Sequence, residues 1–205
     1  GTGSRYRSYD DIILTANIEL TSDITLRKNL KVRSKDGSRY TISVANARQI
    51  EIDPSYKLTL TNIVFDGKNY ASRNEGLFYL KESSDTNKIA RLKLEKGATI
   101  KNVTVTTTAD ADHAVIHAKK GSRIIIDDGA EILNCHNKTA HGNGGAICCD
   151  SGNIIMNGGV IANCSAKGSG GAIRVTGARN LAEDHLGVAF RGDIFLYGGY
   201  ITNNV

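Results

Sequence analysis

The fold is decided by the stretch Leu94-Glu95-Lys96-Gly97-Ala98-Thr99-Ile100-Lys101-Asn102, which recurs three more times before the end of the chain. The later copies are Ile126-Asp127-Asp128-Gly129-Ala130-Glu131-Ile132-Leu133-Asn134, Ile155-Met156-Asn157-Gly158-Gly159-Val160-Ile161-Ala162-Asn163 and Phe195-Leu196-Tyr197-Gly198-Gly199-Tyr200-Ile201-Thr202-Asn203. Each copy has apolar residues, a glycine and then Ile-x-Asn, and the closing asparagines are 32, 29 and 40 residues apart. Repeats of this length are typical of solenoids, propellers and arrays.

A second motif lies between these copies, as Gly144-Gly145-Ala146-Ile147 and again as Gly170-Gly171-Ala172-Ile173. The apolar segments are short and rich in β-branched residues, and Gly, Asn and Asp separate them, which is typical of strands and turns. No window carries a helical apolar stripe that would cover a parallel sheet, so successive units must bury their apolar faces on one another. The pattern predicts an all-β chain, a right-handed single-stranded parallel β-helix whose neighbouring strands lie about 4.8 Å apart.

Composition is consistent with one elongated domain. The chain has 205 residues, with 22 Gly and a single Pro, as expected where many turns need positive φ but few need a rigid corner. Trp is absent and aromatic residues make up 6% of the chain, so no broad aromatic platform for sugars or bases is expected. No apolar run is long enough to span a membrane. The four cysteines lack the spacing of a metal site, and we expect neither a metal nor a cofactor.

The two ends of the chain carry separate predictions. Residues 1–17 are interpreted as a tag remnant followed by a cap, because Ser8-Tyr9-Asp10-Asp11 before Ile12 resembles a capping box that starts a short helix. Such a helix would cover the first coil of the solenoid. Residues 18–205 are expected to form the β-helix. The last motif ends close to Val205, so we expect a fragment of a longer chain, since an open solenoid end exposes its core.

Two stretches resemble the opening coils of bacterial cell-surface β-helix proteins of the pectin-lyase-like superfamily. They are Ala16-Asn17-Ile18-Glu19-Leu20-Thr21-Ser22-Asp23-Ile24-Thr25-Leu26 and Leu58-Thr59-Leu60-Thr61-Asn62-Ile63-Val64-Phe65-Asp66-Gly67. The two Gly-Gly-Ala-Ile copies are similar to the repeat of polymorphic outer-membrane proteins and related adhesins. Those repeats carry Phe three residues before the Asn, a place held here by Thr99, Glu131, Val160 and Tyr200. The resemblance implies either an adhesin or a polysaccharide-cleaving enzyme.

Enzymes of this superfamily need clustered carboxylates and a basic residue on one outer face. Asp112-His113 and Asp127-Asp128 are the densest candidates in the sequence, and the alignment of the coils places no carboxylate ladder beside Asp127 and Asp128. We therefore predict no catalytic residues. The chain is expected to be a secreted or surface-displayed bacterial adhesin or spacer segment, located outside the cell. A polysaccharide lyase or glycoside hydrolase and a purely structural stalk are the alternatives.

A basic cluster in the first half is the predicted ligand-binding surface. Its members are Arg27, Lys28, Lys31, Arg33, Lys35 and Arg39. Alternation with apolar residues places several of them on one outward face, where they would hold an anionic glycan or a host or cell-wall polymer. Nucleic acid is not expected, because no aromatic residue interleaves within the cluster. The alternative is a solvated face that resists aggregation. If the cluster binds, reversing Arg27, Lys31 and Arg33 to Glu abolishes retention on a polyanion.

A possible reactive thiol follows from alignment of the coils. The alignment puts Cys148 outward between His117 and Arg174, where a cationic neighbour would lower the pKa of a thiol. The alternative is a surface thiol without a role. Cys149 is predicted to lie in the core. Cys135 and Cys164 both follow a motif asparagine, so they should stack about 4.8 Å apart. We expect two reduced thiols there, because in-register side chains give an awkward disulfide torsion.

The four motif asparagines are predicted to form a structural ladder. They are Asn102, Asn134, Asn163 and Asn203. An inward asparagine at a tight turn tolerates left-handed backbone and bonds to its equivalents in the neighbouring coils. Replacement of Asn134 or Asn163 by Ala is then expected to cost about 1–3 kcal/mol, the penalty for buried polar partners left unmet. Replacement of Asn203, at the end of the ladder, should cost less.

Overall fold

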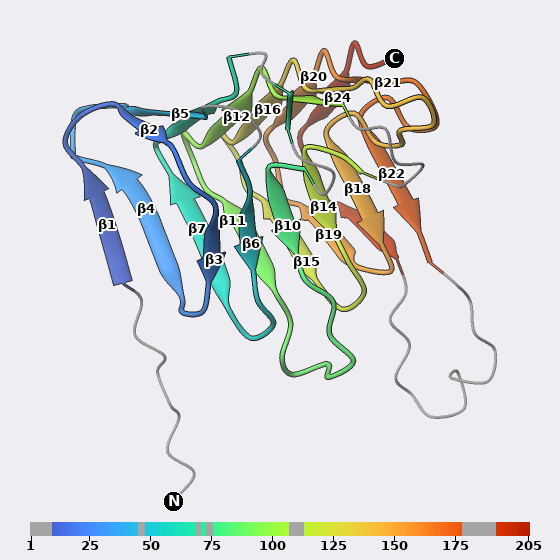
Figure 1. The fold of residues 1–205 in the computed structure, drawn as a ribbon, viewed down its shortest axis with the longest axis horizontal. Helices are drawn as coiled ribbons and strands as arrows, with labels where there is room; N and C mark the ends of the chain where they lie inside the picture. The colour runs from blue at the N-terminus through green and yellow to red at the C-terminus, as the bar shows by residue number, and fades with distance from the viewer. Residues whose placement is uncertain (1–9, 45–47, 69–70, 73–75, 107–112, 178–191) are drawn as a thin grey trace, which may run out of the picture.

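The computed structural model describes residues 10–44, 48–68, 71–72, 76–106, 113–177 and 192–205. These residues form 24 strands and no helix, and all strand pairs are parallel. The strands belong to successive coils that stack along the long axis of the molecule, from the first coil in blue to the last in red (Figure 1). The prediction of an all-β parallel solenoid is therefore confirmed.

Four parallel sheets form the walls of the solenoid. Sheet A consists of β1 (Asp10–Leu14), β4 (Leu30–Ser34), β7 (Lys57–Thr61), β11 (Arg91–Leu94), β15 (Arg123–Ile126), β19 (Asn153–Met156) and β23 (Asp193–Leu196). Sheet B consists of β2 (Ile18–Leu20), β5 (Thr41–Val44), β8 (Val64–Asp66), β12 (Thr99–Lys101), β16 (Glu131–Leu133), β20 (Val160–Ala162) and β24 (Tyr200–Thr202). Each coil passes from sheet A to sheet B and then on to sheet C.

Two further sheets complete the walls, and sheet D has the shortest strands. Sheet D consists of β9 (Ala71–Ser72), β13 (Thr104–Val105), β17 (His136–Asn137) and β21 (Ser165–Ala166). Sheet C consists of β3 (Ile24–Leu26), β6 (Ile50–Ile52), β10 (Phe78–Leu80), β14 (Ile116–Ala118), β18 (Ile147–Asp150) and β22 (Ile173–Thr176). Because every strand pairs with its equivalents in the coils before and after, hydrogen bonds between coils run along the solenoid axis.

The core is built from rows of equivalent apolar side chains. In sheet B the row runs Ile42, Phe65, Ile100, Ile132, Ile161, and every member is buried. Phe65 meets Phe78 of sheet C edge to face, with ring centroids 5.2 Å apart. Strand alternation sends the residues between these positions outward. The register therefore fixes which side chains each outer face presents.

Two kinds of corner turn the chain between sheets with left-handed backbone. In the coils that carry the repeated motif, the corner from sheet A to sheet B uses glycine, as at Gly97 with a φ of 76° and Gly129 with a φ of 73°. The corner after sheet B uses asparagine. Glycine adopts this conformation without strain, and asparagine tolerates it better than most residues. The Gly-x-x-Ile-x-Asn motif thus encodes two successive corners and the inward residue between them.

The predicted capping helix is wrong for the residues that the structure describes. Asp10–Leu14 is strand β1, which pairs with β4 over its whole length, so the solenoid begins before residue 18. Ile12 and Leu14 face the interior beside Val32 and Ser34. A helix this short is marginal in water, whereas pairing with β4 along the whole segment gives its alternate residues backbone hydrogen bonds. The tag remnant, Ser8 and Tyr9 lie outside the described residues.

Candidate functional site

The outer face of sheet C brings together the predicted reactive thiol and its neighbours. Tyr79, His117, Cys148 and Arg174 occupy one outward row, in β10, β14, β18 and β22. The ring of His117 contacts Tyr79 at 5.6 Å and His113 at 5.7 Å between centroids. The structure therefore confirms the predicted register, in which Cys148 lies between His117 and Arg174.

Burial changes what this row can do. His117 is 1% exposed and Cys148 is fully buried, so the thiol is not on the surface as the alternative interpretation assumed. A reactive thiol needs both a stabilised thiolate and access for its partner. The geometry supplies a basic neighbour but no open path to the sulfur atom in this structure. The row packs the outer side of sheet C rather than presenting a nucleophile.

Next to it runs a second outward row of ion pairs. Nζ of Lys81 lies 2.9 Å from Glu51 and 3.0 Å from Asp53. These hydrogen bonds, opposed by partial burial, raise the pKa of Lys81. Further along, Lys119 lies 3.2 Å from Asp150. Burial raises the pKa of Asp150, but the hydrogen bonds from Lys119 and a threonine outweigh burial and lower it.

The outer face of sheet A carries the most extensive charged network. Glu95 accepts hydrogen bonds from Nζ of Lys31 at 3.0 Å and from Oγ1 of Thr61 at 2.7 Å. Nζ of Lys93 bridges Glu95, at 3.1 Å, and Asp127 of the next coil, at 2.9 Å. Partial burial raises the pKa of Glu95, but these three hydrogen bonds outweigh it and lower the pKa to about 2. The network therefore spans four coils and holds the carboxylate of Glu95 ionised.

The predicted basic cluster is divided among three places. Lys31 and Arg33 lie on the outer face of sheet A, Arg27 and Lys28 on the corner from sheet C to sheet A, and Lys35 and Arg39 on the corner from sheet A to sheet B. Acidic side chains neutralise most of it. The pairs are Arg27–Asp53 at 3.2 Å, Lys28–Asp10 at 2.5 Å, Lys31–Glu95 at 3.0 Å, Arg33–Asp11 at 2.9 Å and Arg39–Glu131 at 3.5 Å. Lys35 is exposed. The six cations do not form one free basic surface.

The four motif asparagines occupy equivalent corners, and the backbone conformation that they share differs in its physical basis from the predicted ladder of inward side chains. Asn102, Asn134, Asn163 and Asn203 all have φ between 52° and 56° at the same corner. Nδ2 of Asn134 donates to Oδ1 of Asn102 at 3.4 Å, and Asn102 donates to Asp66 at 3.1 Å. The side chains of Asn134, Asn163 and Asn203 are exposed, so the expected inward placement is wrong. In left-handed backbone at a convex corner the side chain projects into solvent.

This geometry gives a sharper prediction for Asn134. The Asn134→Ala variant should lower the free energy of unfolding by about 1 kcal/mol, because alanine is strained in left-handed backbone. Asn134→Gly should cost clearly less, since glycine adopts the same φ freely. Urea denaturation midpoints of the two variants provide the measurement. Equal losses in both variants would show that the side-chain hydrogen bond from Asn134 to Asn102, rather than the left-handed φ, accounts for the contribution of Asn134 to stability.

All four cysteines are buried free thiols. Cys135 and Cys164 are neighbours in consecutive coils, where the amide of Ser165 donates to the carbonyl of Cys135 at 3.0 Å. Burial is the main cause that raises the pKa of Cys135 well above its ordinary value, and the hydrogen bond with Cys164 raises it further. Cys149 lies in the core as predicted, and burial raises its pKa to about 12. These thiols are packing groups.

Thiol counting checks this assignment. The purified chain, denatured without added reductant and titrated with a thiol reagent, should give four free thiols per molecule. The Cα atoms of in-register cysteines lie about 4.8 Å apart, which a disulfide accepts, but their parallel side chains disfavour its torsion. A count of two would mean that Cys135 and Cys164 form a disulfide and that their assignment as free thiols is wrong.

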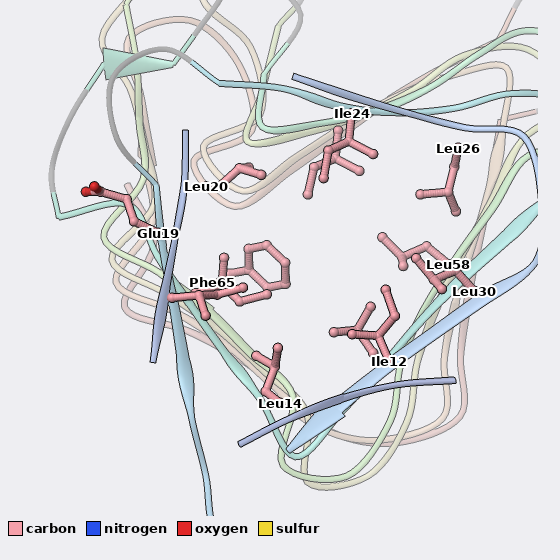
Figure 2. A pocket seen from close by; sticks show the side chains of 13 residues that line it. Ile12, Leu14, Glu19, Leu20, Ile24, Leu26, Leu30, Leu58 and Phe65 are labelled. Atoms are coloured by element: carbon pink, nitrogen blue, oxygen red, sulfur yellow. The ribbon is translucent and has the colours of Figure 1, made fainter. Parts of the chain in front are cut away.

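The N-terminal end of the described part of the solenoid contains a cavity of about 150 Å³. Figure 2 shows its apolar lining, with Ile12 and Ile24 of the first coil at the rim and Phe65 deeper, while the carboxylate of Glu19 points away. Ile12 is 45% and Ile18 is 46% exposed. The cavity is the cross-section of the core at the first coil. It offers apolar contact and no convergent polar groups, unlike a typical small-molecule site.

Comparison with known proteins adds no identification: no protein-family model, curated protein or solved structure matches the chain. Within the described ranges, no three His, Cys, Asp or Glu side chains are grouped to hold a metal ion. The same residues include no helix with the length and apolarity to cross a membrane. The class of the protein is therefore defined by its fold, a parallel β-solenoid with ion-paired outer faces.

Proposed function

We propose that the chain is a non-enzymatic, ligand-displaying segment of a secreted or surface-displayed bacterial protein of the adhesin type. Its fold would then be a right-handed parallel β-helix of the pectin-lyase-like kind. Supporting this are the continuous stacked coils and the resemblance of the Gly-Gly-Ala-Ile repeats to those of bacterial surface proteins. A solenoid of this form presents its outer side chains at a constant interval, which suits display of a repeated surface.

The observation that carries the proposal is the direction of the pKa shifts on the outer faces. A glycoside hydrolase needs a carboxylic acid with a raised pKa, and a lyase base needs a lysine or arginine that loses its proton readily. Among the described residues, every carboxyl group with a resolved shift has its pKa lowered: Asp53, Asp66, Asp85, Glu95 and Asp150. Lys81 and Lys93 have theirs raised. These groups hold their charges for ion pairing, which is the opposite of what proton transfer requires.

A paired assay of binding and turnover tests the proposal. The purified chain is incubated with pectic, uronic and sulfated host glycans, with and without Ca²⁺, and both saturable binding and new chain ends are measured. Binding without turnover is the expected result. Turnover of any polymer would replace the proposal with a polysaccharide lyase or glycoside hydrolase. If the chain neither binds nor cleaves any glycan of the panel, a purely structural stalk is the remaining interpretation.

A further inference from the structure

The corner between β19 and β20 contains an asparagine that is followed directly by a glycine, Asn157-Gly158. The chain has one other pair of this kind, Asn143-Gly144. In such a pair the backbone nitrogen of the glycine can attack the side-chain amide carbon of the asparagine, because the glycine has no Cβ atom that hinders the approach. The two pairs differ in what the fold does with their reacting groups.

At Asn143 both reacting groups are held by hydrogen bonds to the next coil. The amide of Gly144 donates to the carbonyl of Ser169 at 2.9 Å, and Oδ1 of Asn143 accepts a hydrogen bond from the amide of Ser169 at 2.7 Å. The side chain of Asn143 is half-buried. Attack at this pair would break both bonds where two coils stack, and each broken bond adds to the barrier.

At Asn157 the reacting groups are held less firmly. The side chain is exposed, and within the described part of the chain the amide of Gly158 donates no hydrogen bond. Nδ2 of Asn157 donates to Oδ1 of Asp127 at 2.8 Å. Rotation of the Asn157 side chain therefore breaks this hydrogen bond at a solvent-facing corner and leaves the pairing of β19 and β20 intact.

The stacking of the coils requires a glycine after Asn157. A Cβ atom at Gly158 would lie 2.8 Å from Cα and 2.9 Å from Cβ of Asp128, which belongs to the preceding coil. Any other residue would have to push the two coils apart at this corner. The residue that permits the packing is therefore also the residue that leaves the asparagine open to attack from the backbone.

We infer that Asn157 is a site of spontaneous covalent modification, at which the asparagine is converted to aspartate and isoaspartate. The nitrogen of Gly158 loses its proton to a base in the solvent and bonds to Cγ of Asn157. The bond from Cγ to Nδ2 breaks, and Nδ2 takes up a proton from water and leaves as ammonia. Water then opens the resulting succinimide ring, and the ring nitrogen regains a proton. Opening at Cγ gives aspartate, whereas opening at the main-chain carbonyl carbon gives isoaspartate.

Either product would change the charged network on the outer face of sheet A. The donor that Asp127 now has at 2.8 Å would be replaced by a second carboxylate, and like charges this close repel each other. Nζ of Lys93 already bridges Glu95 and Asp127, so one ammonium group would face carboxylates in three successive coils. Isoaspartate would also lengthen the backbone at a corner where the next residue has no room for a Cβ atom.

Peptide mapping by mass spectrometry tests the site, with the purified chain held at mildly alkaline pH and sampled over time. Conversion at Asn157 should be about tenfold faster than at Asn143, the ratio expected when one more hydrogen bond must break. The chain unfolded in urea should convert both pairs at similar rates, because the difference comes from the fold. Equal rates in the folded chain, or faster conversion at Asn143, would overturn the inference. So would an unchanged Asn157 in the folded chain after the unfolded chain has converted fully.

The Asn157→Asp variant tests the effect on the network, because it carries the product carboxylate from the start. Its urea denaturation midpoint should lie below that of the wild type. The matched control, Asn163→Asp, places the same charge on an exposed corner residue whose neighbours in the adjacent coils are asparagines, and its midpoint should fall clearly less. Equal shifts in the two variants would contradict the repulsion assigned to Asp127.

Discussion

Gly145→Ala should lower the free energy of unfolding by about 3 kcal/mol or prevent folding. A Cβ atom at this position would lie 2.0 Å from the carbonyl oxygen of Gly171 and 2.6 Å from backbone atoms of Ser165. Those atoms belong to the next coil, where Gly171 occupies the second copy of the Gly-Gly-Ala-Ile motif. Backbone atoms in a hydrogen-bonded ladder cannot move aside as a flexible side chain can, so the methyl group must separate two coils.

Gly37→Ala is the control for this prediction. Nothing lies within 4 Å of a Cβ atom at Gly37, but its φ of 76° strains an alanine, so the loss should be about 1 kcal/mol. Denaturation midpoints of both variants measure the difference between steric and conformational cost. If Gly145→Ala is no less stable than Gly37→Ala, the two motif copies do not stack as described.

Acid should weaken the solenoid through Glu95. Its pKa lies at about 2 in the folded chain, below the ordinary value of 4.5, so the folded state binds fewer protons than the unfolded state across that interval. The stabilisation is fully present above about pH 4.5 and is lost as the pH falls toward 2. The Glu95→Gln variant should therefore be about 2 kcal/mol less stable than the wild type at pH 7, after allowance for the partial exposure of the carboxylate. Its free energy of unfolding should fall less steeply than that of the wild type on acidification.

Unfolding free energies measured from pH 7 to pH 2 compare wild type with this variant. Asp36→Asn is the control, because it removes a carboxylate that pairs with Arg33 while its side chain is 99% exposed. The control curve should follow the wild type. Parallel curves for wild type and Glu95→Gln would show that the network of Lys31, Lys93 and Asp127 does not depend on this carboxylate.

The repeats made the register predictable from the sequence. Ile132 and Ile161 share one inward row because the spacing from glycine to asparagine is kept, and Cys148 falls beside His117 for the same reason. The partners of the charged residues were not predictable in this way. Lys31 reaches Glu95 across 64 residues, past an intervening coil whose threonine side chains are short enough to allow it. Such a pairing depends on side-chain length in three coils at once, which a repeat pattern does not encode.

Two local signals were overridden by tertiary structure. The capping box ahead of Ile12 predicts a helix, but the edge of β4 offers more backbone hydrogen bonds than one helical turn. The basic run ending at Arg39 suggests one surface, but its members are divided between two corners and the face of sheet A between them. The shared register of Lys57, Arg91 and Arg123 could be predicted, since each precedes the first apolar residue of its strand in sheet A.

The direction of the hydrogen bonds between coils also determines how the molecule responds to force. Because these bonds lie parallel to the long axis, tension applied between the two ends pulls each coil directly away from its neighbour. Bonds in one coil then break before those in the next are loaded, as in unzipping, rather than all together as in shear. A solenoid built from such coils would lengthen stepwise under load while its remaining coils stay folded.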